Sequence, residues 1–318
     1  MQLGVCAQVL YAMPFETALD TAAAEGFAAI ELPVDSSNPF IDLDAALDGG
    51  ADALLSALDR RGLRCSALSN HQEGQLLLGP HGEDTDVIWP GSAEAKAARA
   101  ADRLVRSAEL ARRMGVTTVI AFTGCREWAR WFPWPLADGW ERMQGEFRDR
   151  LRPILDEYAC RGVRLALECH PKQFAYNLET ARLAWELVDR HDALAFNLDP
   201  ANLLLAGMDP VVFAAELGSR VAHVHAKDGE RVQHHVERSG LLAHGPWDRP
   251  GRGFRFRIPG WGDVPWRRLI TELHLAGFDG VLSVEHEDPT MGRLEGLRQA
   301  RRYLEPLLLH DRQEARWW

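Results

Sequence analysis

The sequence lacks three features that would each define a class of protein. It has no run of about 18 or more apolar residues, and its first 15 residues lack the basic start and long apolar core of a signal peptide. Its five cysteines are an odd number without CxxC spacing, which argues against disulfides and a structural zinc site. We therefore expect a reduced, cytoplasmic protein that makes no contact with a membrane.

Positive charge is also scarce relative to negative charge. The formal net charge is −10 at pH 7, and lysine and arginine are spread along the chain without a long basic run. An acidic surface repels phosphates, so we expect no nucleic-acid partner. The chain is 46% apolar and 26% charged, an ordinary globular composition that can bury a large core.

Short apolar runs alternate with amphipathic patterns along the whole chain. The expected strands cover residues 3–10, 28–34, 63–70, 116–124, 163–167, 194–198, 221–225 and 281–284. Helical patterns follow each of them, including 43–61 after the second, and 72–91 is expected to be a loop. Eight such units without a break in composition predict α/β architecture, a single (β/α)8 TIM barrel over residues 1–318. A long polar loop insertion is expected around 229–263, after the seventh strand.

The last four expected strands each end in a side chain that can bind a metal. They end in Glu168, Asp199, His225 and Glu285. The carboxyl ends of the strands of such a barrel open onto one face, so these side chains should converge. His223 lies on the same face of its strand as His225 but deeper, which makes His225 the better candidate.

Three converging carboxylates would repel one another strongly unless a cation lay between them. The sequence therefore predicts one divalent metal ion held by Glu168, Asp199, His225 and Glu285. A set of carboxylates with one imidazole suits Mn²⁺, Mg²⁺ or Co²⁺ best, and zinc is also compatible.

The stretch 125–138 concentrates tryptophan between prolines and charges, which suits neither a helix nor a strand. It follows the fourth strand at its carboxyl end, so we expect Trp131 and Trp134 over the barrel mouth. Two interpretations stay open. The stretch is a hydrophobic plug or subunit contact, or it is a wall that stacks on a sugar ring.

The motifs ECHP (168–171), NLDPAN (197–202), HVHAKD (223–228), PGWGD (259–263) and VEHEDP (284–289) resemble those of the xylose-isomerase-like TIM barrels. This group is also labelled sugar phosphate isomerases/epimerases, and it includes ketose 3-epimerases, inosose dehydratase and endonuclease IV. In the ketose 3-epimerases, Glu, Asp, His and Glu from the last four strands hold a metal, and the two Glu move protons. The resemblance therefore implies that Glu168 and Glu285 are catalytic as well as metal ligands.

The sequence departs from the ketose 3-epimerase pattern at two places. Asn202 stands where those enzymes have a second histidine, and Lys227 stands where glycine is expected in their HxGE motif. Arg231 matches by spacing an arginine that binds their substrate. We expect His71, His170, Asn202, Lys227, Arg231, Trp131 and Trp134 to contact the substrate.

The leading functional hypothesis is a metal-dependent isomerase or epimerase of a small carbohydrate or cyclitol. It would remove a proton next to a carbonyl and pass through an enediolate. The alternative is a lyase or dehydratase that acts on an inosose or a 3-oxo glycoside, including C-glycoside cleavage, with the same metal and base. A non-catalytic barrel subunit is a further alternative, whereas phosphodiester cleavage is disfavoured by the acidic charge. A homo-oligomer or a hetero-oligomer is expected.

Overall fold

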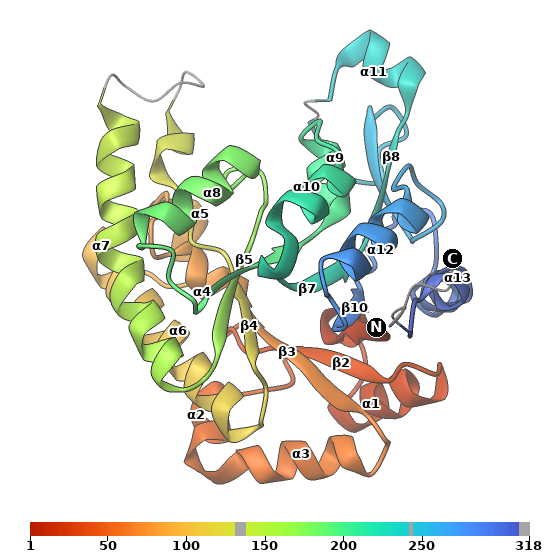
Figure 1. Ribbon diagram of the computed structural model, residues 1–318, viewed down its shortest axis with the longest axis horizontal. Coiled ribbons are helices and arrows are strands. Elements are labelled where there is room, and N and C mark those ends of the chain that lie inside the picture. The colour runs from red at the N-terminus through yellow and green to blue at the C-terminus, as the bar shows by residue number, and fades with distance from the viewer. Residues whose placement is uncertain (131–137, 242–243, 312–318) are drawn as a thin grey trace, which may run out of the picture.

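Eight parallel strands close into a barrel in the computed structural model, which describes residues 1–130, 138–241 and 244–311 (Figure 1). The barrel strands are β1 (Gln2–Cys6), β2 (Ala29–Pro33), β3 (Arg64–Asn70), β4 (Thr118–Ala121), β5 (Arg164–Glu168), β6 (Leu194–Leu198), β7 (Val221–Ala226) and β10 (Val281–Val284). The barrel closes by parallel pairing of β1 with β10, where Val5 is opposite Val284. The predicted TIM barrel is confirmed.

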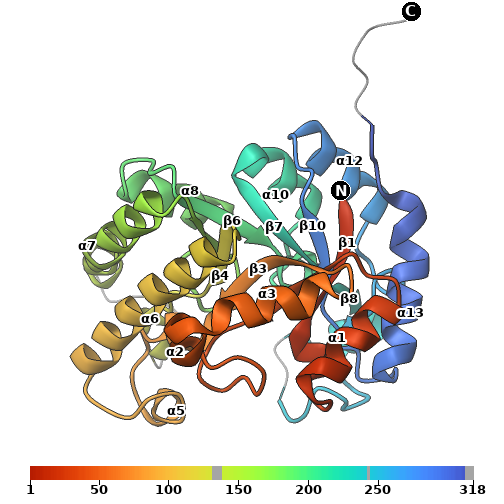
Figure 2. The ribbon, with the colours of Figure 1, turned by 90° about the horizontal axis from the view of Figure 1, so that it is seen from below.

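Helices surround the barrel, as Figure 2 shows from below. The main ones are α1 (Phe15–Ala24), α3 (Ala51–Asp59), α6 (Ala93–Arg113), α7 (Gly139–Cys160), α8 (Leu178–Leu187), α10 (Pro210–Leu217), α12 (Trp266–Leu275) and α13 (Arg293–Leu304). Helix α6 begins where the Ser92 hydroxyl accepts a hydrogen bond from the Ala95 amide, and it buries Leu104 and Ala108. Each helix thus covers the barrel with an apolar face.

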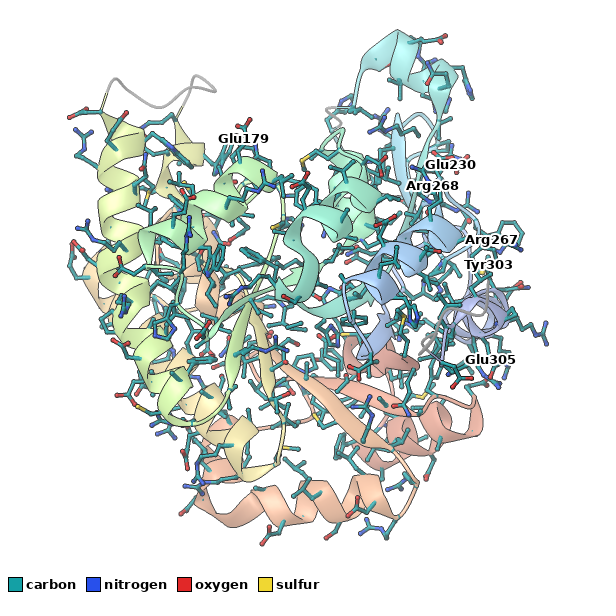
Figure 3. The ribbon with its side chains drawn as sticks, in the orientation of Figure 1. Glu179, Glu230, Arg267, Arg268, Tyr303 and Glu305 are labelled. Carbon is teal, nitrogen blue, oxygen red and sulfur yellow. The ribbon has the colours of Figure 1, made fainter. Side chains whose placement is uncertain are left out.

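The outer faces of these helices are charged. In α12, Trp266 and Leu269 are buried, whereas Arg267 and Arg268 lie on the outside of the molecule (Figure 3). Glu305, just after α13, is exposed as well. Among the described residues, no helix combines the length and apolar character that spanning a bilayer requires.

Three expected elements differ from the structure. Strand β1 ends at Cys6, and a 3-10 turn over Ala7–Leu10 follows it. The helix expected over 43–61 is interrupted, because Gly49 takes a positive φ of 103° between α2 (Leu43–Ala45) and α3. The expected loop 72–91 contains the short helices α4 (His71–Gln75) and α5 (Glu83–Asp86).

The insertion after β7 is more regular than the loop that we predicted. Strand β8 (Asp228–Arg231) pairs antiparallel with β9 (Phe254–Arg257), and α11 (Gln233–Ser239) stands out between them (Figure 1). Phe254 and Phe256 are buried on one face of β9, whereas Arg255 and Arg257 on the other face are partly exposed. This alternation is the period of a strand, so β9 was detectable in the sequence.

Small side chains occupy the inside of the barrel below the mouth. Ala67, Ile120, Ala166 and Ala195 form an apolar cluster of their own, separate from the core under the helices. Because inward-facing residues alternate along a strand, Glu168 and Asn197 lie one layer above Ala166 and Ala195. The apolar cluster thus lies directly below the polar residues of the mouth.

Candidate metal centre at the barrel mouth

A cavity of about 540 Å³ opens at the carboxyl ends of the strands. The titratable residues that line it include Glu31, His71, Glu168, His170, His225, Lys227, Glu285 and Glu287. A larger depression of about 700 Å³ lies elsewhere, between α2 and α6, and its lining includes Asp44 and Arg106. We take the smaller cavity as the functional site because the convergent side chains from the strand ends line it.

Glu168 ends β5 and is almost fully buried, with 4% of its surface exposed. Its Oε1 accepts a hydrogen bond from Asn202 Nδ2 at 3.0 Å. Its Oε2 accepts one from Asn197 Nδ2 at 2.9 Å and lies 3.1 Å from both His71 Nε2 and His225 Nδ1. Burial alone would raise the pKa of this carboxyl, but the two histidines outweigh it and hold the pKa well below its usual value.

Asp199 follows β6 and begins the short helix α9 (Pro200–Leu205), which the sequence analysis did not predict. Its Oδ1 accepts hydrogen bonds from the amides of Ala201 and Asn202, at 2.9 and 3.2 Å. Its Oδ2 accepts one from Asn202 Nδ2 at 2.7 Å and lies 2.9 Å from Lys227 Nζ. One carboxylate therefore caps a helix and faces the centre of the mouth.

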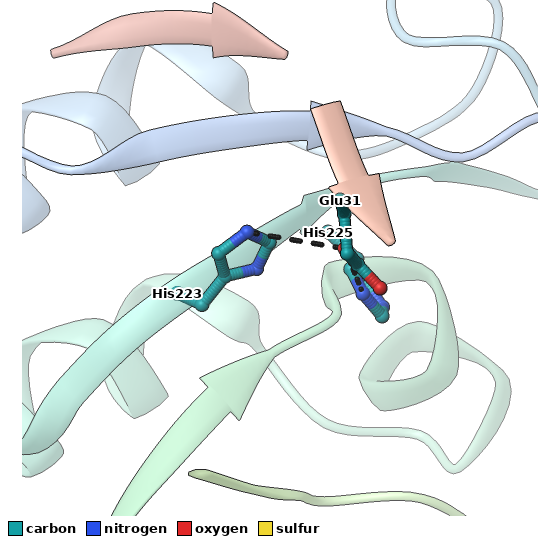
Figure 4. Close-up of side chains that lie close together, drawn as sticks. All are labelled: Glu31, His223 and His225. Atoms are coloured by element: carbon teal, nitrogen blue, oxygen red, sulfur yellow. Dashed lines mark hydrogen bonds and ion pairs between the residues drawn. The ribbon is translucent and has the colours of Figure 1, made fainter. Parts of the chain in front are cut away.

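His225 lies on β7 with both ring nitrogens in polar contact. Its Nε2 is 3.0 Å from Glu31 Oε2 (Figure 4). Its Nδ1 is 3.3 Å from Glu285 Oε2 and lies on the side of Glu168. Glu31 is completely buried on β2. Burial would raise the pKa of Glu31, but the charge and hydrogen bond of His225 prevail and lower it. Burial would lower the pKa of His225, but the charges of Glu31, Glu168 and Glu285 outweigh it and raise this pKa well above its usual value. Nε2–H donates to Glu31, and a metal ion at Nδ1, the nitrogen on the side of Glu168, would take the place of a proton there.

His223 lies one layer deeper than His225, as the sequence predicted. Its Nδ1 is 3.2 Å from Asn197 Oδ1. Its buried Nε2 has no hydrogen-bond partner among the described residues but lies 3.9 Å from Glu31 Oε2 (Figure 4). Burial lowers the pKa of His223 to about 4, so it is neutral at physiological pH.

Lys227 brings a positive charge into the same mouth. Its Nζ lies 2.9 Å from Glu285 Oε2, 2.9 Å from Asp199 Oδ2 and 3.3 Å from Glu287 Oε2. This ammonium does not balance all the carboxylates. Burial, reinforced by the charges of Glu168 and Glu285, raises the pKa of Asp199 to about 7 against the opposing effect of Lys227. A cation beside Asp199 would therefore stabilise its ionised form.

The residues present fit a divalent cation. One ligand atom each from Glu168, Asp199 and His225 lies within 4.8 Å of the other two, and all three residues are buried. Two oxygens and one imidazole nitrogen are a usual donor set for a catalytic ion that keeps open positions. Glu31, His223 and His225 form a second such group deeper in the barrel. Among the described residues, Glu285 belongs to neither group.

The other residues predicted to contact substrate are distributed unevenly. His71 and His170 line the cavity. Burial would lower the pKa of His71, but the hydrogen bond with Glu168 outweighs burial and raises this pKa. For His170, burial prevails and lowers the pKa. Arg231 directs its guanidinium to the Leu204 carbonyl, at 2.8 Å from Nη2, and is not among the cavity-lining residues. Trp131 and Trp134 fall outside the described residues.

Four residues of the site were missed by the sequence analysis. Glu31 was not among the expected site residues, although it is the only charged residue within β2. Asn197 sits between Glu168 and His225, and its place in NLDP gave no sign of this role. Trp247 and Phe256 come from the insertion and line the cavity together, with their ring centroids 4.8 Å apart.

Fold and site together define a TIM barrel with a cluster of acids and histidine that could hold a metal at the carboxyl ends of its strands. The family model described as Xylose isomerase-like TIM barrel matches residues 19–307. The chain therefore belongs to the xylose isomerase-like TIM barrel family, as the resemblance of its motifs indicated.

The chain is similar to several proteins over most of its length. It is 29% identical to the uncharacterized protein YfiH of Bacillus subtilis over 318 residues, which cover 94% of this chain and 96% of that protein. It is also 29% identical to a Streptomyces coelicolor protein provisionally named a hydroxypyruvate isomerase, with 85% of each chain covered. A solved structure of the IolI protein with a bound zinc atom is similar in fold. Its TM-score is 0.69 at 19% identity, and 97% of this chain and 98% of that chain are covered.

Proposed function

We propose that this chain is a divalent-metal-dependent isomerase that moves a proton between neighbouring carbons of a small sugar or cyclitol. The proposal rests on a difference between the surroundings of the two carboxylates beside His225 Nδ1, those of Glu168 and Glu285. Glu168 is fixed on both oxygens by neighbouring side chains, whereas Glu285 is held at Oε2 by Lys227 and His225 and faces the cavity with 15% of its side chain exposed.

A carboxylate that already accepts several hydrogen bonds is a weak base, because protonation would cost it those bonds. Glu168 is such a group, so its part is to bind the cation. Glu285 keeps an oxygen for the substrate and acts as the general base. One base serves one face of a substrate, which favours isomerisation through an enediol over inversion of a stereocentre.

A divalent ion held by Glu168, Asp199 and His225 would supply Lewis-acid polarisation of a carbonyl and the neighbouring hydroxyl. Mn²⁺, Mg²⁺ and Co²⁺ suit these donors, and the zinc bound in the IolI structure makes Zn²⁺ a further candidate. His170 and Asn202 line the cavity and are available to orient substrate hydroxyls. The family and the named relative support a hydroxycarbonyl substrate.

The test is deuterium exchange at the α-carbon in D₂O over a panel of aldoses, ketoses and inososes. Glu285→Gln should lower the exchange rate by about 10²–10⁴-fold because the amide cannot carry the proton. Glu168→Gln should lose exchange by releasing the metal, so excess Mn²⁺ should restore part of it. Excess Mn²⁺ should not rescue Glu285→Gln.

Glu179→Gln is the matched control, since Glu179 is exposed on α8 and should exchange like the wild type (Figure 3). Wild-type exchange by Glu285→Gln would show that another group is the base, with His170 next in line.

Elimination is the second candidate, and one observation favours it. The Lys227 ammonium lies 2.9 Å from the Glu285 carboxylate, so a proton donor stands beside the base, as loss of a hydroxyl group requires. The first step would be the same proton abstraction. Product mass separates the two reactions, because isomerisation conserves mass and dehydration loses one water.

A further inference from the structure

A further cavity, of about 270 Å³, lies at the amino-terminal ends of the barrel strands, opposite the mouth; we call it the floor cavity. The polar side chains that line it include those of Arg64, Ser66, Thr118, Arg164 and Asp279. Ala166 and Glu168 face the inside of the barrel, so Arg164, at the start of the same strand, faces inward as well. The chain thus places a guanidinium group at the bottom of its barrel.

This guanidinium group has no counter-charge. Arg164 is partly buried, and within the described part of the chain it forms no ion pair and no hydrogen bond. Burial and the charge of Arg220 both lower the pKa of Arg164. Arg220 itself is paired with Asp192, at 3.3 Å. An inward-facing cation without a partner costs free energy, so Arg164 suits a ligand that brings negative charge.

Hydroxyl groups lie at the same cavity. The Ser66 Oγ atom is buried and has no hydrogen-bond partner among the described residues. Thr118 is 3% exposed and lies opposite Arg164 in the register of β4 and β5, so its side chain stands beside the guanidinium group. Buried hydroxyls are normally hydrogen-bonded, so this grouping favours a ligand that accepts hydrogen bonds.

The balance of charge at the cavity is positive. Arg64 is exposed at its edge, and its Nε donates to Gln2 Oε1 at 2.7 Å, which leaves the two terminal nitrogens for a ligand. Of the described residues that line the cavity, only Asp279 is acidic, and it is exposed to solvent. Two arginines and one aspartate attract an anion, although the whole chain has a net charge of −10.

We propose that the floor cavity binds a tetrahedral oxyanion, either inorganic sulfate or phosphate or the phosphate group of a small monoester. Arg164 and Arg64 donate charge-assisted hydrogen bonds to it, and the hydroxyls of Ser66 and Thr118 complete the set of donors. The apolar cluster that includes Ala166 lies between this site and the mouth. The inference therefore does not rest on the proposed function.

The test is isothermal titration calorimetry of the purified protein with sulfate at constant ionic strength. Sulfate is the probe because it stays doubly charged at neutral pH. Arg164→Gln should raise the Kd by about tenfold or more, because hydrogen bonds to a charged group are lost. Arg64→Gln should raise it less, because Arg64 is exposed to water and salt. Arg268→Gln is the matched control on the outer face of α12 and should bind like the wild type (Figure 3).

Thermal unfolding separates loss of the ligand from loss of the fold. Without sulfate, Arg164→Gln should melt no lower than the wild type, because the variant gives up a cation that has no partner. Added sulfate should raise the Tm of the wild type and of Arg268→Gln more than that of Arg164→Gln.

Titration with glycerol phosphate distinguishes the two sources of the oxyanion. A Kd equal to that of sulfate identifies an inorganic ion, whereas a Kd at least about tenfold lower, lost in Arg164→Gln, identifies a phosphomonoester. No binding of either compound by the wild type would overturn the proposal. A Kd that Arg164→Gln and Arg64→Gln both leave unchanged would overturn it too, since binding would then lie elsewhere.

Discussion

His225 owes its orientation to Glu31, a residue nearly two hundred positions away in the sequence. The imidazole can present a lone pair at only one nitrogen when neutral, and the partner of the other nitrogen selects which one. Glu31 Oε2 lies 3.0 Å from Nε2, so Nδ1 is left for the mouth. Such supporting hydrogen bonds set the orientation of metal-binding histidines and the strength with which they bind.

Glu31→Gln tests this arrangement. The amide keeps the volume but loses the charge, so Mn²⁺ affinity should fall by about 10–100-fold with the fold intact. Calorimetric titration with Mn²⁺ measures the change. Asp35→Asn is the matched control, because Asp35 is a buried acid of the same cavity that hydrogen-bonds to Ser37 rather than to His225. Equal affinities of the two variants would contradict the role of Glu31.

The identity of Glu168, Asp199 and His225 as metal candidates could be predicted from sequence, because each follows or ends an apolar run. Their partners could not. Glu31 reaches the site from β2, and only closure of the barrel brings that strand near His225 on β7. Asn197 reaches it from β6, which pairs with both β5 and β7. The register of neighbouring strands, such as Glu168 opposite Asn197, is likewise not encoded in either strand alone.

Among the secondary-structure elements, α9 depends on Asp199, which caps this helix and is also a candidate metal ligand. Its Oδ1 caps α9 and its Oδ2 faces the mouth, so the position of this ligand depends on a helix of only six residues. The helix was not foreseen because its sequence PANLLL is short and shows no clear periodicity. The proline at its first position is nonetheless a known start signal.

Substitutions at Asp199 can separate these two functions. Asparagine is as good an N-cap as aspartate, whereas alanine is not. Asp199→Asn and Asp199→Ala should both lose bound Mn²⁺, measured by plasma mass spectrometry after dialysis. In metal-free urea denaturation, Asp199→Ala should be less stable than Asp199→Asn by about 1 kcal/mol. Retention of Mn²⁺ by either variant would argue against Asp199 as a ligand, and equal stabilities would argue against the cap.

In the whole molecule, the insertion 229–263 extends from the barrel, and we call it the arm. The hairpin of β8 and β9 with α11 follows β7 directly, and it carries Trp247 and Phe256 to the cavity. Composition and alternation were enough to predict the barrel, because every strand repeats the same pattern. They were not enough to predict the arm, since 229–263 is rich in polar residues and glycine and only Phe254 to Arg257 alternates. The aromatic wall expected from Trp131 and Trp134 stays a prediction. The arm supplies other aromatic side chains to the cavity, those of Trp247 and Phe256.

Trp247 should therefore contribute to substrate binding rather than to chemistry. It is 46% exposed, packs on Phe256 and has the Arg252 guanidinium 3.8 Å from its ring centre. A ring held in this way offers sugar C–H groups a flat apolar contact. Trp247→Ala should raise KM for the best substrate of the panel while kcat changes little, because the contact is equal in ground and transition states.

Trp261→Ala is the control, since Trp261 is 52% exposed and is not a cavity-lining residue. A KM that rises equally in both variants, or a fall confined to kcat for Trp247→Ala, would show that the arm does not bind substrate through this ring.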